Sequence, residues 1–213
     1  FGIQQAANAV VAGGARCVLM VNPEITSPHL NFRDRDSHFI FGDVCTAAII
    51  ERAGDCVSQD AYEILSMKLL THYSNTIRNN FGFMNHAEDD DLFADDKLFR
   101  QQGRKVFKDV VPMVVKLIGE HLEQNGLSAR KLRRMWLHQA NLNMNRVIME
   151  KLLGREASDD EAPTILDEYA NTASAGSIIV FHKRRERFER GEHGVICSFG
   201  AGYSIGSVLV RKV

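Results

Sequence analysis

The sequence has little of what marks membrane, secreted or metal-binding proteins. Its apolar runs fall well short of the ~18 residues that cross a bilayer, and we expect neither a membrane span nor a signal peptide. The cysteines form no C-x-x-C pair, and three of them lie in apolar, strand-like runs; they are Cys17, Cys45, Cys56 and Cys197. We therefore expect buried thiols in a reducing, cytoplasmic setting, with neither a disulfide framework nor a metal site.

An excess of charge is also lacking. Lysine and arginine number 26 and aspartate and glutamate 27, a formal net charge of −1, so we expect no overall attraction to nucleic acid or membrane. The basic run Lys183–Arg187 lacks interleaved aromatic residues and is interpreted as a solvated helix face. The acidic run His86–Asp96 lacks the glycine and ligand spacing of a calcium loop and is interpreted as a surface loop. A hydrophobic content of 45% is typical of soluble globular proteins.

An initiating methionine is missing as well. The chain begins at Phe1, and residues 2–14 carry apolar side chains at helical spacing with no capping residue ahead of them. Gly13 and Gly14 end this helix. We expect the sequence to be the remainder of a longer protein.

The following segments are shorter. Residues 16–22 form a continuous apolar run typical of a buried parallel strand, and Pro23 and Pro28 bracket a loop. Two apolar runs flank Gly42 and Asp43, which predicts a strand or short helix, a tight turn and a strand.

Two arginines, Arg33 and Arg35, precede that region in a polar loop. Solvated loop charge and contacts to an anionic ligand are equally good interpretations. Residues 54–84 predict a strand followed by an irregular segment.

One long amphipathic helix is predicted over 96–125. Its apolar stripe consists of Phe107, Val110, Val111, Val114, Val115, Ile118 and Leu122. Pro112 predicts a kink or the true first turn, and Gly126 ends the helix. Ser128 is the expected N-cap of a short helix.

Strands and helices then alternate. The predicted strands are 134–138, 163–167, 194–199 and 204–212, and the predicted helices are about 142–153 and 174–190. This order is typical of an α/β fold with a mostly parallel sheet and helices on both faces. The last strand follows a tight turn, so we expect it to pair antiparallel.

Polar groups follow three of these strands: His138, Asn171 and the turn Gly200–Gly202. Each alone is more often a cap or a core hydrogen-bonding group. Together at one sheet edge, an imidazole, a carboxamide and backbone N–H groups would stabilise a developing enolate or oxyanion. No nucleophile accompanies them, since no cysteine lies at the mouth of a predicted helix beside these loops and no G-x-S-x-G motif occurs.

Four segments in order resemble the β-ketoacyl-acyl-carrier-protein synthase III family of the thiolase superfamily. They are Asp34–Arg35 leading into Phe41–Asp43, His138–Asn141, Asn171–Ser177 and Phe199–Gly206. The resemblance implies a layered αβαβα fold, with residues 1–84 as the remainder of a first half and 85–213 as the second. It implies an acyltransferase of fatty acid biosynthesis that acts as a homodimer on an acyl-CoA primer and malonyl-acyl carrier protein. Coenzyme A thioester is then a substrate, and no cofactor is implied.

The same resemblance implies roles for individual residues. His138 and Asn171 would stabilise the enolate, and the Ala201 amide would be an oxyanion donor, with alanine in place of the usual glycine and demanding backbone angles. Further implied substrate contacts are Arg35 on the coenzyme A nucleotide, Gly103 and Asn141 on the pantetheine, and Arg146. The family's cysteine would precede Phe1, so this chain alone is expected to be inactive.

One departure keeps alternatives open. Asn143 stands where the family has an arginine that docks the carrier protein, and Arg146 is a candidate substitute. A condensing enzyme with another acceptor, making a quinolone, a polyketide or a head-to-head product, is the first alternative. A non-catalytic half, acting beside a partner that carries the cysteine, is the second.

Overall fold

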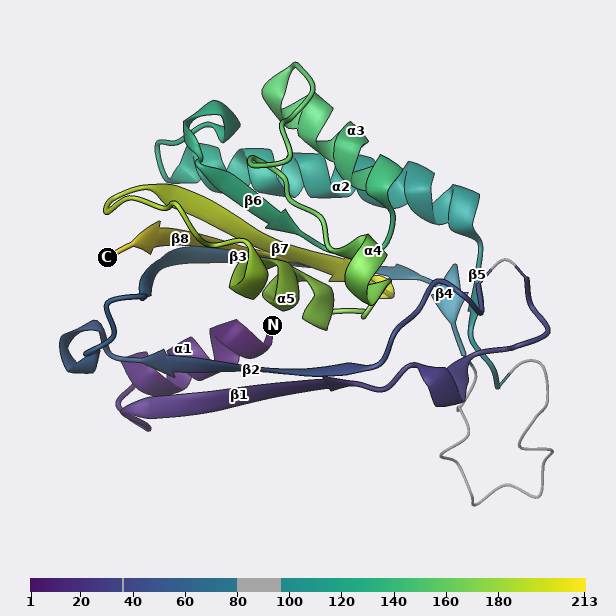
Figure 1. Cartoon of the computed structure of the whole chain (residues 1–213), viewed down its shortest axis with the longest axis horizontal. Coiled ribbons are helices and arrows are strands. Elements are labelled where there is room, and N and C mark those ends of the chain that lie inside the picture. Colours follow the sequence, from purple (N-terminus) through teal and green to yellow (C-terminus); the bar gives the residue numbers. More distant parts are fainter. Residues whose placement is uncertain (36, 80–96) are drawn as a thin grey trace.

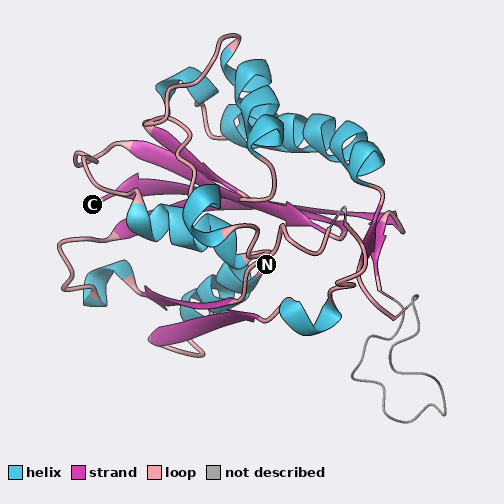
Figure 2. Cartoon of the chain, turned by 45° about the vertical axis from the view of Figure 1, so that its right-hand side comes forward, coloured by secondary structure: helices cyan, strands magenta, loops and turns pink. Residues whose placement is uncertain are grey.

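The computed structural model describes residues 1–35, 37–79 and 97–213. In these residues the chain forms successive layers, visible in Figure 1. Helices α2 (Gly103–Gln124) and α3 (Leu142–Leu153) cover one face of a four-stranded sheet. Helices α1 (Gly2–Val11) and α5 (Ala175–Lys183) lie on the other face, between this sheet and a two-stranded sheet. Figure 2 shows the same helix–sheet–helix–sheet order from a second direction.

The four-stranded sheet has the order β3-β8-β7-β6. Its strands are β3 (Tyr62–Ser74), β6 (Arg134–Leu137), β7 (His193–Gly200) and β8 (Gly202–Lys212). Only β6 and β7 are parallel, while β8 runs antiparallel to both β7 and β3. The antiparallel last strand is confirmed, but the mostly parallel sheet is wrong, because β8 turns straight back and then pairs with a strand from far upstream.

The predicted strand at 163–167 is also wrong. Residues 163–165 form no strand, and α4 (Leu166–Tyr169) follows them. The fully buried Gln139 explains the difference: its Oε1 accepts hydrogen bonds from the Ile165 N–H and the Thr164 hydroxyl, both at 3.1 Å. The Ile165 N–H therefore bonds to a side chain, where the prediction expected it to bond to a neighbouring strand.

The main core lies between α2, α3 and the sheet. The predicted stripe of α2 faces it, with Val110, Val111, Val114, Ile118 and Leu122 buried. Helix α2 begins at Gly103 and contains Pro112 in its interior, so the predicted start at 96 is wrong. Helix α3 has the predicted bounds: Asn141 caps it by accepting the Met144 N–H at 3.1 Å, and Gly154 ends it at φ 71°.

The opposite face of the sheet packs on α5 through an aromatic cluster. Trp136 is fully buried, stacks on Phe188 and donates its Nε1–H to the Arg184 carbonyl at 2.8 Å. Helix α5 stops at Lys183, short of the predicted residue 190.

Three residues of the basic run form ion pairs and stay partly exposed at the surface, as the solvated-face interpretation expects, but only Lys183 lies on the helix. Lys183 and Arg184 both bind Glu168, and Arg185 binds Asp60.

The amino-terminal part differs most from the prediction. Strand β1 (Cys17–Glu24) pairs with β2 (Val44–Glu51), and the pairing is antiparallel, not parallel. One face of this ribbon packs on α1 and the other is exposed. Cys17 and Cys45 lie on the exposed face and Cys56 is half-buried, so among the four thiols only Cys197 is buried as predicted.

The segment between these two strands is irregular. Pro23 belongs to β1, and Pro28 lies in a short 3-10 helix, η1 (Ser27–His29). No tight turn forms at Gly42–Asp43; instead the Asp43 carboxylate accepts hydrogen bonds from the backbone and side chains of Thr26 and Ser27.

Three further predictions concern the linkers and the halves. Residues 129–131 form the 3-10 helix η3 (Ala129–Lys131), and Ser128 precedes it without a side-chain capping bond. The acidic run at 86–96 lies outside the described residues. The division at residue 84 stays a prediction. Across the residues that the structure describes, no helix is long and apolar enough to span a membrane.

Candidate active site

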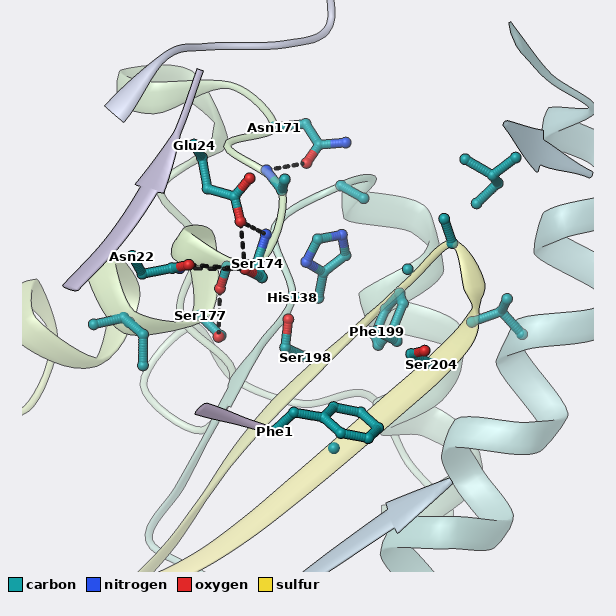
Figure 3. Close-up of a pocket in the computed structure, with 18 of the residues that line it drawn as sticks. Phe1, Asn22, Glu24, His138, Asn171, Ser174, Ser177, Ser198, Phe199 and Ser204 are labelled. Atoms are coloured by element: carbon teal, nitrogen blue, oxygen red, sulfur yellow. Dashed lines mark hydrogen bonds between the residues drawn. The ribbon is translucent and has the colours of Figure 1, made fainter. Parts of the chain in front are cut away.

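A cavity of about 670 Å³ is lined by residues of the four-stranded sheet, the β1–β2 ribbon and the helices beside them. It collects residues from α1, β1, β3, α2, α5, β7 and β8, together with His138 directly after β6. Figure 3 shows that His138, Asn171 and Phe199 gather around it, with Phe1 on a neighbouring side. Segments that are far apart in the sequence therefore meet in one place.

His138 follows β6 and is 6% exposed. Burial lowers the pKa of its imidazole to about 4, and the Ala173 backbone acts weakly in the opposite direction. The Phe199 ring lies edge-on to the imidazole with centroids 4.8 Å apart. The Asn145 side chain donates to the His138 carbonyl at 3.0 Å and so fixes its backbone. The ring is therefore neutral near pH 7 and can offer one N–H to a substrate oxygen.

Asn171 is 8% exposed, and its backbone is paired on both sides. Its N–H donates to the Ile40 carbonyl at 2.8 Å, and its carbonyl accepts the Gly42 N–H at 3.0 Å. Its side-chain Oδ1 accepts the Ala173 N–H at 3.0 Å. Because the oxygen is engaged, the amide presents its Nδ2 amino group as the donor (Figure 3).

The turn between β7 and β8 supplies a third wall. Ala201 and Gly200 both line the cavity. The expected demand on the backbone of Ala201 does not arise, since the positive φ of this turn falls on Gly202, at 132°. An L-residue is therefore accommodated at position 201 without a left-handed conformation.

The amino-terminal end of α1 also reaches the cavity. Phe1, Gly2 and Ile3 line it, and a Cβ at Gly206 would lie 3.9 Å from the Phe1 nitrogen. Helix N-termini carry partial positive charge and unpaired N–H groups. This end of the cavity favours an anion.

The other predicted site residues divide into two groups. Gly103, at the start of α2, and Asn141, the cap of α3, both line the cavity. Arg35 and Arg146 are exposed and do not line it. The structure thus gathers His138, Asn171, Ala201, Gly103 and Asn141, and leaves the two arginines outside.

Several polar residues that line the cavity were not predicted as site residues, among them Asn22, Glu24 and Ser174. Asn22 and Glu24 are the only polar side chains on the inner face of β1, which is otherwise apolar. That pattern is visible in the sequence, although nothing local indicates that both residues contact Ser174 (Figure 3).

Two neutral donors and a backbone turn can stabilise negative charge on a thioester oxygen. Across 1–35, 37–79 and 97–213, no three His, Cys, Asp or Glu side chains form a group that could hold a metal ion. The chemistry that the cavity supports directly is the stabilisation of an enolate or oxyanion by hydrogen bonds.

Comparison with known proteins gives the family. The C-terminal model of 3-oxoacyl-[acyl-carrier-protein (ACP)] synthase III matches residues 122–212, and the 3-oxoacyl-[acyl-carrier-protein (ACP)] synthase III model matches residues 1–72. The chain belongs to the 3-oxoacyl-[acyl-carrier-protein] synthase III family. The resemblance inferred from the four motif segments is confirmed.

Individual relatives agree with this membership. A β-ketodecanoyl-[acyl-carrier-protein] synthase of Pseudomonas aeruginosa is 61% identical over 212 residues, which cover 100% of this chain and 61% of the relative. The chain thus spans about three fifths of that protein.

Solved structures agree as well. The β-ketoacyl-[acyl carrier protein] synthase III from Thermus thermophilus has 25% identity and a TM-score of 0.80, covering 99% of this chain and 63% of that one. The priming β-ketosynthase of the R1128 polyketide pathway has 25% identity and a TM-score of 0.81, covering 98% and 61%. The expected thiolase-like layered fold is confirmed.

Proposed function

We propose that the protein containing this chain is a 3-oxoacyl-[acyl-carrier-protein] synthase III type acyltransferase of fatty acid biosynthesis. It condenses an acyl-CoA primer with malonyl-acyl carrier protein and releases carbon dioxide. The observation that carries this proposal is the meeting of His138 and Asn171 in one cavity with the amino-terminal end of α1.

In this reaction the acyl group is held as a thioester while the malonyl group decarboxylates. Loss of carbon dioxide leaves an enolate, whose oxygen accepts hydrogen bonds from the His138 imidazole and the Asn171 amide. The buried, neutral imidazole supports this role because it donates without carrying a charge of its own. The enolate carbon then attacks the acyl thioester, and the turn at Ala201 donates a backbone N–H to the oxyanion. Collapse of this tetrahedral intermediate breaks the carbon–sulfur bond and releases the cysteine as a thiolate.

The acyl-holding cysteine is proposed to lie just ahead of α1 in the natural polypeptide. A thiol there would meet the positive end of the helix, which favours the thiolate. The support is geometric, since Phe1 and Gly2 already border the cavity that holds His138.

The primer is proposed to be a medium-length acyl chain. The Pseudomonas aeruginosa relative is named for a β-ketodecanoyl product, and one condensation adds two carbons, so an eight-carbon primer would give that product. The cavity wall is suited to such a chain, because much of it is apolar. Its apolar residues include Met20, Ile40, Phe41, Met67, Leu69, Phe99, Val106 and Phe107.

The remaining partners are part of the same proposal. Gly103 and Asn141 would contact the pantetheine arm, Arg35 the coenzyme A nucleotide and Arg146 the carrier protein. The functional unit would be a homodimer. The alternative is a non-catalytic half that acts beside a partner carrying the cysteine. The mass of the purified natural polypeptide distinguishes the two. A mass well above 23.9 kDa, together with a reactive cysteine, supports the enzyme.

Replacing His138 by alanine tests the reaction. The His138→Ala variant of the natural polypeptide should lose malonyl decarboxylation, because the enolate loses a donor, while acyl-CoA still acylates the cysteine. Mass spectrometry of the acyl-enzyme and release of labelled carbon dioxide measure the two steps separately. Full condensation by the variant would refute the proposal.

A second candidate is a condensing enzyme with another acceptor. The observation that favours it is the exposed Asn143 where the family has a docking arginine. Initial rates with malonyl-acyl carrier protein, malonyl-CoA and a second acyl-CoA distinguish the two, since only the first candidate requires the carrier protein.

A further inference from the structure

The inner face of β1 ends in two polar side chains that point toward the site. Along Cys17–Glu24 the residues alternate between exposed and half-buried, and Asn22 and Glu24 are both on the half-buried side. Both line the cavity (Figure 3). A carboxylate in a cavity proposed to stabilise an enolate requires an explanation, because two negative charges close together repel each other.

The contacts of Glu24 give that explanation. Its Oε1 accepts the Ser174 N–H at 3.2 Å and also the Ser174 hydroxyl. Asn22 Nδ2 donates to the same hydroxyl oxygen at 3.2 Å. Ser174 is the N-cap of α5 but makes no side-chain bond to its own helix. Glu24 thus provides, from another element, the hydrogen-bond acceptor for the N-cap of α5.

Ser174 ends a short segment that contains the proposed enolate-binding groups. Asn171 opens the segment and accepts the Ala173 N–H on its Oδ1. Ala173 has a φ of 47°, a conformation that L-residues rarely adopt and that surrounding contacts must hold. The Ala173 backbone also raises the pKa of the His138 imidazole, against the larger lowering by burial.

The segment from Asn171 to Ser174 is therefore fixed at both ends. Residues 40 and 42 hold the backbone of Asn171, and Glu24 holds Ser174. A shift at Ser174 would move Ala173 and reorient the Asn171 amide, and the distances from the donors to a substrate oxygen would change with it.

We propose that Glu24 is a positioning residue for the enolate-binding pair. It acts through Ser174 and does not touch the substrate; the inference rests on the proposed condensing function. The hydrogen-bond acceptor at this position is what matters, not the charge.

Two variants of the natural polypeptide test this. Glu24→Ala should lower the kcat of malonyl decarboxylation by about 10- to 100-fold, as expected when a catalytic group is displaced, with KM nearly unchanged. Glu24→Gln keeps an Oε1 acceptor for Ser174 and should restore the rate to within about threefold of the unmodified protein. Acylation of the cysteine by acyl-CoA should proceed normally in both, which also reports that they are folded.

Glu63→Ala is the matched control, because it removes a strand glutamate that pairs with Arg211 away from the cavity; its rate should be unchanged. A Glu24→Ala rate within threefold of the unmodified protein, or a Glu24→Gln rate as low as that of Glu24→Ala, would overturn the inference. Absence of decarboxylation in the unmodified protein, or full activity of His138→Ala, would refute the proposed function itself.

Discussion

At His138, burial and chemistry act in the same direction. The folded protein binds a proton on this ring with a pKa of about 4, against an ordinary value of 6.5. Burial penalises the imidazolium and so maintains the neutral donor that the proposed enolate site requires. The ring needs no charged neighbour for this, and the main perturbation of its pKa is desolvation.

This has a consequence for stability. Between about pH 6.5 and pH 4 the unfolded chain binds more protons than the folded one, so the free energy of unfolding should fall as the pH falls through this window, by up to about 3 kcal/mol. Chemical denaturation at pH 7 and at pH 5 measures the loss. A His138→Asn variant lacks the titrating group and should lose less; an equal loss in both would contradict this account.

Cys197 gives a second residue-scale prediction. It is fully buried, and burial raises the pKa of its thiol to about 12. Since the thiolate is the reactive form, Cys197 should resist iodoacetamide in the native chain and react after denaturation. Exposed Cys17 and Cys45 serve as internal controls and should react without denaturant. Peptide mapping by mass spectrometry identifies the modified residues.

At the scale of elements, the position of Asn171 depends on a close backbone approach. A Cβ at Gly42 would lie 2.5 Å from the Tyr169 carbonyl oxygen, so only glycine allows residues 40–42 to pair with Asn171. This glycine follows an irregular loop, and its partner lies far along the sequence. Glycine is required at position 42 for a steric reason, because two loops pack closely there.

Gly42→Ala should therefore separate the two segments. We expect a loss of about 1–3 kcal/mol in the free energy of unfolding and a fall in malonyl decarboxylation, because Asn171 moves with its backbone. Gly119→Ala is the control: nothing lies within 4 Å of a Cβ there, inside α2, and alanine should stabilise by about 0.5–1 kcal/mol. Thermal unfolding measures both, and equal stability of Gly42→Ala and the parent would refute the steric argument.

Elements with local signals were the ones that the sequence predicted well. Helix α3 has a polar cap at Asn141 and a left-handed glycine at Gly154, and both ends lie where the sequence placed them. The apolar run at 163–167 carried no sign that Gln139 would bind its backbone. For the proposed site, short motifs predicted His138 and Asn171, and both line one cavity. The contact of Glu24 with Ser174 spans 150 positions and has no local signature.

At the scale of the whole molecule, the two sheets differ in how they are covered. The four-stranded sheet has a helix layer on each face (Figure 2). The β1–β2 ribbon packs on α1 with one face and exposes apolar side chains on the other, with Leu19 64%, Val21 53% and Ile49 68% exposed. Exposed apolar faces of this kind favour association.

The 213-residue chain should therefore self-associate when it is produced alone. Replacing Leu19 and Ile49 by lysine should increase the monomer fraction in light scattering, because two charges then oppose contact between ribbons. Val57→Lys is the control, since Val57 is exposed in a loop outside the ribbon. If Val57→Lys increases the monomer fraction as much as the double variant does, the added positive charge explains the effect, and association through the ribbon is refuted.

The order β3-β8-β7-β6 also has a consequence for synthesis on the ribosome. Strand β8 lies between β3 and β7, yet it is translated after β3, β6 and β7. A nascent chain that has reached β7 holds β3 with no partner in this sheet, and pairings of such long sequence separation form slowly. Until β8 emerges, the wall of the cavity formed by Met67 and Leu69 cannot close against Gly206 and Val208. The cavity wall is therefore completed only after β8 has left the exit tunnel.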